Sequence, residues 1–592
     1  MEFVASFSGG KDSTLAIKRM IDNGHRIIAI IVSKKKDLDE SWTHGLSKKF
    51  FKEAAEVLRC DLIEVSTNVE DYEKNFENGL KSAKEIGAQA CVFGDIDINI
   101  HLKWNKDRCK NAGLQCIHPL MFEDRNSICR EFISSGLNAK IVKVDEKKLP
   151  KDFLGKNYNE DFLKLLDEFK GVDKCGENGE FHTSIDIDSM QKVFCKGIYV
   201  DNASTCFPKA PGVSTAMEKF IDNKSFSINR GTYMNSYRLS SDIIDVRDKF
   251  LKFFNAPRNY QCVFVPSATE GINMVLRGLL SEGENLIVDE RLHNSSWRTI
   301  EFLKNRDVDI FNIGGEMHRG FDTEGKESGE INIDRSNMNN AFDYIKSKIN
   351  NKTKAVFVTL VDNITGKYLT EVESIANLCF EKDIYFIVDA VQAVCEVEVD
   401  IEKLKADVLI VSSHIGMMGP EGIASVIMSE KASKNIKSLI FGGTGSQSNS
   451  PNMPTTLPDK FEAGTMNHSG IIGCAKALEY IERVGLENVI ERKRFLGQKL
   501  RDELQKIEGI KVKGYGSFCS MTVEGEDDSM VSFNMDLNDG IMTRVGIQCS
   551  PCTHMSEGSF PNGSIRMSVG YFNSERDVEQ IIKSLRKILN NN

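Results

Sequence analysis

The first residues able to do chemistry are near the N-terminus, where residues 8–13 read Ser-Gly-Gly-Lys-Asp-Ser. Two glycines let the backbone turn tightly and direct successive N–H groups at one point, and a helix that follows adds its positive end. Lys11 contributes a full charge, and Ser8 and Ser13 contribute hydroxyl donors. The pattern predicts a phosphate-binding loop. Its spacing differs from the Gly-x-x-x-x-Gly-Lys-Ser/Thr loop of common nucleotide triphosphatases.

A second reactive stretch is residues 175–183, which contain Glu177, Glu180 and His182. Two carboxylates beside a histidine and flexible glycines can hold Mg²⁺, orient a nucleophile or bind an amine. A polar surface turn is the alternative for this segment taken alone. Asp12 in the first loop is a further candidate ligand for Mg²⁺.

The elements that must position these side chains alternate along the first part of the chain. Apolar strands are expected at residues 3–7, 27–32, 62–65 and 90–93, with helical patterns between them. Unbroken apolar runs are typical of parallel strands that helices cover on both faces. We therefore expect an α/β, doubly wound domain. Ligands in such sheets bind at the carboxyl ends of strands, where residues 8–13 and the pair Gly94 and Asp95 fall.

These motifs together resemble the diphthine–ammonia ligase family of ATP pyrophosphatases, across residues 1–190. The resemblance rests on the loop at residues 8–13, on Gly94-Asp95-Ile96, on residues 153–156 and on residues 175–183. It implies that ATP is cleaved to AMP and pyrophosphate, that a carboxylate or carbonyl is activated, and that ammonia attacks to give an amide. The resemblance implies phosphate binding by Ser8, Gly9, Gly10, Lys11, Asp12 and Ser13. Residues 98–104 fit the substrate-lining stretch of the family only loosely.

From residue 197 to 592 a new series of short motifs follows, including residues 267–273, 362–366, 387–392 and 461–467. In order and number these motifs resemble those of the class V aminotransferases, and most closely the cysteine desulfurases. This implies a pyridoxal phosphate (PLP) enzyme of fold type I, with large and small subdomains and a homodimer. Matching positions are Ala268 and Thr269 (cofactor phosphate), His293 (stacking on the ring), Asn363 (ring hydroxyl), Asp389 (pyridinium nitrogen), Gln392, His414, Thr444 (phosphate of the neighbouring subunit) and Arg566 (substrate carboxylate).

One position departs from the family in a way that matters chemically. The residue after His414 is Ile415, where the family has the lysine that forms the Schiff base with PLP. Lysine both holds the cofactor covalently and moves the proton that leads to product. Ordinary PLP catalysis is therefore in doubt, although free PLP or a preformed amino-acid adduct can still bind through the remaining residues.

Cys549 resembles the nucleophilic cysteine of the desulfurases, which makes it the candidate sulfur carrier. Cys552 follows three residues later and can resolve a persulfide as a disulfide. The alternative is that both are passive thiols. A zinc site is disfavoured, because no second cysteine pair has ligand spacing.

The length, composition and net charge of the chain limit which classes of protein it can be. A chain of 592 residues, 41% hydrophobic and 27% charged, is expected to form at least two globular domains, here 1–190 and 197–592. No long apolar run occurs, so we expect no membrane segment and a cytoplasmic location. The 15 scattered cysteines suit a reducing compartment. A net charge of −10 argues against a generally basic nucleic-acid binder, while tRNA as an acceptor stays open.

Three functions follow, in order of preference. The first is an ATP-dependent ligase that forms an amide or thioamide, with Cys549 relaying sulfur from L-cysteine or a persulfide protein. The second is amidation alone, with the rear domain a dimer scaffold or a sensor of PLP or an amino acid. The third is an active cysteine desulfurase that uses another lysine. The identity of the acceptor is left open by the sequence.

Overall fold

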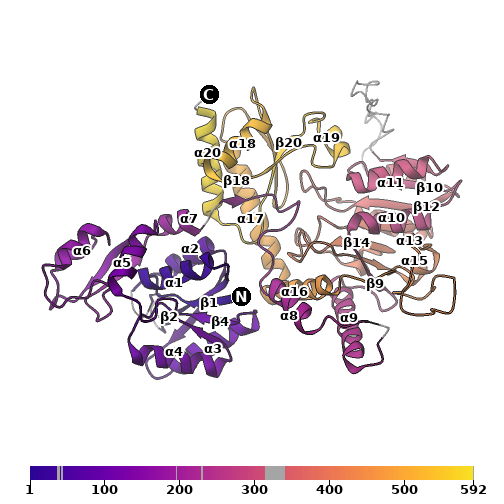
Figure 1. Cartoon of the computed structure of the whole chain (residues 1–592). Helices are drawn as coiled ribbons and strands as arrows, with labels where there is room; N and C mark the ends of the chain where they lie inside the picture. The colour runs from indigo at the N-terminus through magenta and orange to yellow at the C-terminus, as the bar shows by residue number, and fades with distance from the viewer. Residues whose placement is uncertain (37–39, 42–44, 195–196, 229–230, 314–340, 591–592) are drawn as a thin grey trace. The chain divides into compact units, whose positions relative to one another are not determined.

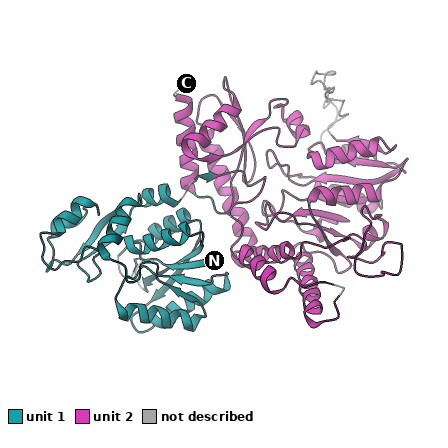
Figure 2. Ribbon diagram, in the orientation of Figure 1, with its two compact units in different colours: residues 1–198, 572–574 teal, residues 199–571, 575–592 magenta. Residues whose placement is uncertain are grey.

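The computed structural model describes residues 1–36, 40–41, 45–194, 197–228, 231–313 and 341–590. Their contacts divide the chain into two compact units (Figures 1 and 2). The first contains residues 1–198 and 572–574, and the second contains residues 199–571 and 575–592. In the described part of the chain, no helix is long and apolar enough to cross a membrane.

The first unit is built on a parallel sheet with strand order β3-β2-β1-β4-β5. Its strands are β1 (Glu2–Ser6), β2 (Arg26–Lys35), β3 (Asp61–Thr67), β4 (Ala90–Val92) and β5 (Gln115–Ile117), and its connecting helices are α1 (Lys11–Asp22), α2 (Lys48–Leu58), α3 (Tyr72–Glu85) and α4 (Asn99–Ala112). The order reverses at β1, so the β1/β4 boundary is the topological switch point. This confirms the doubly wound α/β fold that the sequence predicts.

Both faces of this sheet are buried, and β1 shows how. Phe3 and Ala5 join the apolar core on one face with Leu15 of α1, whereas Val4 joins the opposite core with Leu80 of α3. Alternate residues of a strand point to opposite faces, so an uninterrupted apolar strand serves two helix layers.

The remainder of the first unit follows the parallel sheet in sequence and packs back against the loop at residues 8–13. It contains α5 (Arg125–Ser134), β6 (Ala139–Val144), the 3-10 helix η1 (Lys151–Phe153), α6 (Glu160–Leu166), β7 (Phe181–Ile185) and α7 (Ile187–Phe194). Strands β6 and β7 pair antiparallel. The backbone N–H of Ile185 donates to the carbonyl of Gly9, over 2.8 Å, which ties the end of β7 to the phosphate loop.

The second unit contains a large mixed sheet with strand order β11-β10-β12-β13-β14-β15-β9. Its strands are β9 (Gln261–Val265), β10 (Asn285–Val288), β11 (Asp309–Asn312), β12 (Thr353–Thr359), β13 (Tyr385–Asp389), β14 (Val408–Ser412) and β15 (Ala424–Met428). The pairs from β11 to β14 are parallel, while β15 runs antiparallel to both β14 and β9. Strands β12, β13 and β14 are buried over nearly their whole length, as their apolar runs predict.

Helices surround this sheet, and a smaller sheet follows it in sequence. The helices of the unit are α8 (Val213–Asn223), α9 (Met234–Phe253), α10 (Ala268–Leu279), α11 (Asn294–Lys304), α12 (Ala341–Lys348), α13 (Val372–Glu381), α14 (Ile401–Leu404), α15 (Glu430–Asn435), α16 (His468–Val484), α17 (Leu486–Leu504), α18 (Asp528–Asp539), α19 (Pro551–Glu557) and α20 (Glu575–Asn590). The smaller antiparallel sheet has the order β16 (Ile510–Lys513), β17 (Phe518–Val523), β20 (Ser564–Ser568), β19 (Arg544–Gly546), and the short strands β8 (Ile198–Tyr199) and β18 (Ile541–Met542) pair separately. Large and small subdomains are thus both present.

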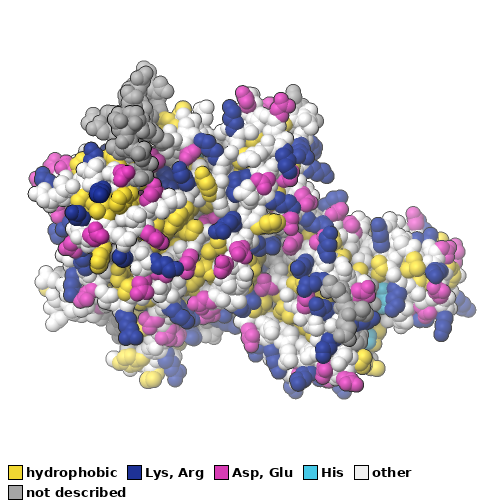
Figure 3. Space-filling view, turned by 180° about the vertical axis from the view of Figure 1, so that it is seen from behind, with side chains coloured by type: hydrophobic (Ala, Val, Ile, Leu, Met, Phe, Trp, Pro, Cys, Tyr) yellow, Lys and Arg dark blue, Asp and Glu magenta, His cyan; other side chains and the backbone are white. Residues whose placement is uncertain are grey.

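The surface carries both signs of charge. On the face seen in Figure 3, basic and acidic side chains are interspersed, without a broad field of one sign. This distribution agrees with the modest negative net charge of −10.

Candidate active sites

A cavity of about 570 Å³ lies at the carboxyl ends of β1 and β4 in the first unit. Ligands of doubly wound sheets bind at such a switch point. The sequence-predicted residues that line it are Ser8, Gly10, Lys11, Asp12, Ser13, Gly94, Asp95, Glu177 and His182. Three stretches that are far apart in sequence therefore meet around one space.

The phosphate loop is shaped by its glycines and hydroxyls. Gly9 has a φ of +82°, and a Cβ there would meet the side chains of Leu46 and Phe50 at 2.5 and 2.9 Å. The backbone N–H of Gly10 donates to Ser8 Oγ (3.3 Å), and the hydroxyls of Ser8 and Ser13 are 3.2 Å apart. Helix α1 begins at Lys11, and Lys11, Asp12 and Ser13 line the cavity. The partial positive charge of the helix N-terminus is therefore at the cavity.

Lys11 is buried, and its ammonium is hydrogen-bonded within the protein. Its Nζ lies 2.6 and 2.7 Å from the two carboxylate oxygens of Asp12 and donates to the carbonyl of Cys175 over 2.7 Å. Burial lowers the pKa of Lys11, but the Asp12 carboxylate outweighs it and the pKa is raised overall. Burial raises the pKa of Asp12 despite the adjacent ammonium. The pair therefore links the phosphate loop to the segment before β7.

The two glutamates of that segment have different surroundings. Glu177 lines the cavity, and burial, reinforced by the charge of Asp12, raises its pKa to about 8. Glu180 is buried and accepts hydrogen bonds from the backbone N–H groups of Asp173 (3.3 Å) and Asn178 (3.1 Å). Glu180 is not among the described residues that line the cavity, so it holds the turn that presents Glu177. His182 lines the cavity, and burial lowers its pKa.

Some lining residues had no individual role in the sequence interpretation. Tyr72, His101 and Trp104 line the cavity, with the last two in the stretch that fits the family loosely. His101 Nδ1 is 3.3 Å from the carboxylate of Asp95, and the rings of Tyr72 and Trp104 are 5.7 Å apart. The feature they share is an aromatic ring, at the first residue of α3 or in the first half of α4. No cluster of three or more potential metal ligands occurs among the described residues.

A second cavity, of about 250 Å³, lies in the second unit. The sequence-predicted residues that line it are Ala268, Thr269, His293, Asn363, Asp389, Gln392, His414, Cys549 and Arg566, together with Ile415. Thr444 is not among its described lining residues. Ser267 caps α10 by accepting the N–H of Glu270, so the start of that helix opens onto the cavity.

The side chains predicted to bind the ring are held in defined positions. Asp389 ends β13, accepts the N–H of Val391 (3.0 Å), and has its pKa raised by burial to about 6. His293 caps α11 by accepting the N–H of Ser295 (3.1 Å), and burial lowers its pKa to about 4. Both side chains line the same cavity, and an acidic group together with a neutral imidazole suits a flat heteroaromatic cation.

Two arginines, Arg544 and Arg566, and the candidate sulfur carrier Cys549 also line this cavity. Arg566 forms an ion pair with Asp201 (2.7 Å) and donates to the carbonyl of Asn363 (2.7 Å). Arg544 Nη2 is 4.0 Å from the sulfur of Cys549, an exposed residue with a φ of +61°. Cys552, in contrast, is part of the apolar core, and burial raises its pKa to about 12. Its surroundings favour a passive thiol over the resolving role that the sequence spacing allows.

Several polar atoms at this cavity have no hydrogen-bond partner among the described residues. They are Thr359 Oγ1, His414 Nδ1 and Arg566 Nε, all buried on residues that line the cavity. Buried polar groups are almost always hydrogen-bonded, so these atoms fit a polar ligand. The residues present therefore suit non-covalent PLP.

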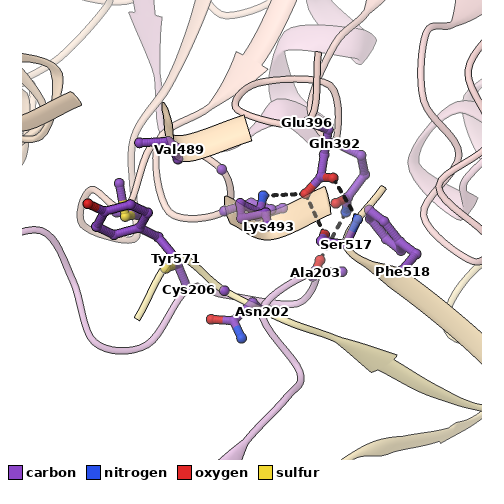
Figure 4. A pocket seen from close by; sticks show the side chains of 14 residues that line it. Asn202, Ala203, Cys206, Gln392, Glu396, Val489, Lys493, Ser517, Phe518 and Tyr571 are labelled. Carbon is purple, nitrogen blue, oxygen red and sulfur yellow. Dashed lines mark hydrogen bonds and ion pairs between the residues drawn. The ribbon is translucent and has the colours of Figure 1, made fainter. Parts of the chain in front are cut away.

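In the described part of the chain, a replacement for the family's missing lysine is not found at the cavity wall. No lysine is among the described residues that line the 250 Å³ cavity. Lys493 lies in a separate cavity of about 20 Å³ that shares Ala203, Gln392 and Ile415 with it (Figure 4). There its ammonium pairs with the Glu396 carboxylate, which also accepts the Ser517 hydroxyl (2.6 Å). Burial lowers the pKa of Lys493, but the charge and hydrogen bond of Glu396 act in the opposite direction, and the pKa is raised overall. The amine therefore stays protonated.

The sequence matches the models of known protein families in both units. The model of the class-V aminotransferases matches residues 198–581. The chain belongs to the class-V aminotransferase family. Models of the N-terminal and C-terminal domains of diphthamide synthase match residues 1–116 and 124–217. Both resemblances read from the sequence motifs are thereby confirmed.

Individual relatives agree with this family. A probable cysteine desulfurase of Methanothermobacter thermautotrophicus is 26% identical over 400 residues, covering 66% of this chain and 94% of the relative. A probable cysteine desulfurase of Pyrococcus abyssi is 28% identical over 424 residues, covering 68% and 97%. The apo structure of the cysteine desulfurase from Thermococcus onnurineus has a TM-score of 0.57 at 24% identity, over 68% of this chain and 96% of that one, and it supports the fold.

Proposed function

We propose that the first unit is an ATP-dependent ligase that transfers AMP to a carbonyl or carboxylate, releases pyrophosphate and forms an amide or thioamide. The observation that carries this proposal is the single 570 Å³ cavity around which the phosphate loop, Gly94-Asp95 and Glu177 meet. The matches to both domains of diphthamide synthase support it.

Each group has a defined task in this proposal. The N–H groups of the loop and the hydroxyls of Ser8 and Ser13 bind the phosphates. Asp12 would hold Mg²⁺, because Mg²⁺ in nucleotide sites usually takes one or two carboxylates. Glu177 and His182 face the acceptor or the nucleophile. Glu180 acts through the turn that it holds.

For the second unit, we infer that PLP or a preformed amino-acid adduct binds without a covalent bond to the chain. Asp389 would pair with the ring nitrogen, His293 would stack on the ring, the start of α10 would take the phosphate and Arg566 a substrate carboxylate. Bound PLP supplies an electron sink for carbanion chemistry. Cys549 would relay sulfur that comes from L-cysteine or from a persulfide protein. The loop of Thr444 would serve a partner subunit in a homodimer.

A second candidate function is amidation with the second unit as a non-catalytic dimer scaffold or sensor. The isoleucine at position 415 favours it, because the ligand-binding residues line the cavity while a lysine does not. A working desulfurase is the third candidate. Release of sulfide from L-cysteine with PLP added would support the third function.

Pyrophosphate release from ATP tests the proposal for the first unit. Lys11→Ala and Asp12→Ala should each reduce release by at least about 100-fold, because phosphate and metal contacts stabilise the developing charge. Lys18→Ala is the matched control, since Lys18 lies on the same helix and pairs only with Asp22 among the described residues. Undiminished release in both loop variants would refute the assignment.

Sulfur labelling tests Cys549 separately. After incubation with labelled L-cysteine or a labelled persulfide donor, Cys549→Ser should carry no label on that loop and release pyrophosphate normally. Cys552→Ser is the matched control, because that thiol is buried in the core. Equal labelling of that loop in Cys549→Ser and in the unmodified chain would exclude Cys549 as the carrier.

A further inference from the structure

Two cysteine thiols lie side by side at the nucleotide cavity of the first unit. Cys129 is on α5, and Cys175 is in the segment before β7. Their sulfur atoms are 3.3 Å apart, and both side chains are buried, at 1% and 3% exposure. Because a disulfide bond is about 2.05 Å long, a shift of about 1.3 Å would join the two sulfurs.

The two thiols are not equivalent. Cys175 lines the 570 Å³ cavity, whereas Cys129 is not among its described lining residues. Cys175 is therefore the thiol that a molecule in the cavity would meet, with Cys129 directly behind it. The backbone of Cys175 is held by Lys11, whose ammonium donates to its carbonyl oxygen over 2.7 Å.

Cys129 is placed to attack the sulfur of Cys175. Its own sulfur lies 3.3 Å from Sγ of Cys175, and Cys129 is not among the described residues that line the cavity. This is the arrangement of an attacking thiolate and its target in thiol–disulfide exchange.

We propose that Cys175 carries a persulfide sulfur into the nucleotide cavity and that Cys129 resolves it, which makes sulfur the nucleophile of the ligase. This inference rests on the proposed function, because it needs an adenylated carbon in the same cavity. It names a thioamide or thiocarboxylate as the class of product.

Sulfur transfer takes place in three steps. A persulfide donor R–S–SH passes its outer sulfur to the Cys175 thiolate, and R–SH leaves. The outer sulfur of the Cys175 persulfide attacks the adenylated carbon, and AMP departs with the substrate oxygen. The Cys129 thiolate then attacks Sγ of Cys175, the bond to the transferred sulfur breaks, and its electron pair stays with the product. The transferred sulfur is reduced and the two thiols are oxidised to a disulfide, which a dithiol reductant returns to the starting state with two electrons and two protons.

The test uses the full chain without ATP or acceptor. The reduced protein is treated briefly with inorganic polysulfide, desalted, blocked with an alkylating agent at successive times and mapped by peptide mass. We expect the unmodified chain to carry sulfur on Cys175, then to lose it while a Cys129–Cys175 disulfide appears. In Cys129→Ser the persulfide on Cys175 should persist at least about tenfold longer, because the adjacent attacking group is gone.

Matched variants keep the test decisive. Cys175→Ser should form neither species, and Cys60→Ser should behave like the unmodified chain, because the half-buried Cys60 is not a described lining residue of the cavity. Loading on Cys175 followed by equally rapid loss in Cys129→Ser would overturn the resolving role. An unmodified Cys175 in a chain that still releases pyrophosphate from ATP would overturn the whole inference and leave the proposed function standing. Normal loading and resolution without pyrophosphate release would contradict the proposed function instead.

Discussion

The two cavities of this chain keep different parts of their families' chemistry. In the first unit, the loop, the switch point and the segment before β7 supply charge, hydroxyls and a carboxylate around one space. In the second, the groups that would hold a ring and a phosphate are present, but Ile415 occupies the position of the covalent anchor. The comparison teaches that the groups suited to a ring and a phosphate do not need a lysine at position 415 for their placement, because Asp389 ends β13, His293 caps α11 and Arg566 lies on β20.

Restoring the anchor is the sharpest way to test this contrast. With PLP and borohydride, we expect no covalent cofactor on the unmodified chain and a stable adduct on Ile415→Lys, because residue 415 lines the cavity. Intact mass measures the adduct. Ile415→Met is the control, since its side chain has similar reach without an amine. A reducible adduct on the unmodified chain would show that another lysine serves, which would favour the desulfurase function.

The first cavity should be easiest to break at Gly94. A Cβ there would meet the backbone N of Ser13 at 2.6 Å and the backbone C of Asp12 at 2.7 Å. Gly94→Ala must therefore displace the phosphate loop, and pyrophosphate release should fall by about 100-fold, as expected for a shift of about 1 Å at a reacting centre.

Gly171→Ala is the matched control for that change. Gly171 has a φ of +82° but nothing within 4 Å of the added Cβ, so only backbone strain is introduced. It should cost about 1 kcal/mol of stability and leave pyrophosphate release intact. Equal loss in both variants would mean that Gly94 has no special part in the loop.

Much of this arrangement could be predicted from the sequence. The alternation of apolar strands with helices gave the doubly wound order, and the glycines placed residues 8–13 at the switch point. Motif order likewise brought Asp389, His293 and Arg566 to one cavity, although Asp389 and Arg566 are 177 residues apart in sequence.

What the sequence could not predict depends on turns and distant packing. Gly176 and Gly179 have φ values of +75° and +79°, and the turn they form directs Glu180 to backbone N–H groups while Glu177 faces the cavity. Sequence spacing alone treats the two carboxylates as equivalent. The contact between Cys129 and Cys175 spans 46 residues and arises only when α5 packs against the segment before β7.

The pH dependence of the first unit should sharpen the role of Glu177. Burial and then the charge of Asp12 raise its pKa to about 8, with Lys11, Asp95 and Arg125 also facing it. Because the pKa lies above the ordinary value of 4.5, Glu177 is mainly protonated at pH 7 and ionises only near pH 8. Holding Mg²⁺ or accepting a proton needs the ionised form.

We therefore expect kcat/KM for pyrophosphate release to rise about tenfold per pH unit up to about pH 8. Glu177→Gln should be slow and lack this limb. Glu146→Gln is the control, because its side chain is 66% exposed. An unchanged slope in Glu177→Gln would assign the ionisation to a different group.

The smallest expected effect concerns Asp389, which tests whether the second cavity still binds PLP through its ring nitrogen. Burial raises the pKa of this carboxyl to about 6, so it becomes neutral as the pH falls below that value. Binding of PLP, followed by absorbance titration, should then weaken as the solution is acidified from pH 7 to pH 5.

Asp389→Asn should bind about tenfold more weakly at pH 7, equivalent to about 1.4 kcal/mol, and should lose most of the pH dependence. Glu398→Gln, whose side chain is 68% exposed, should titrate like the unmodified chain. Equal affinity of Asp389→Asn and the unmodified chain at both pH values would mean that the cavity has lost ring recognition as well as the covalent anchor, and would leave the scaffold as the role of the second unit.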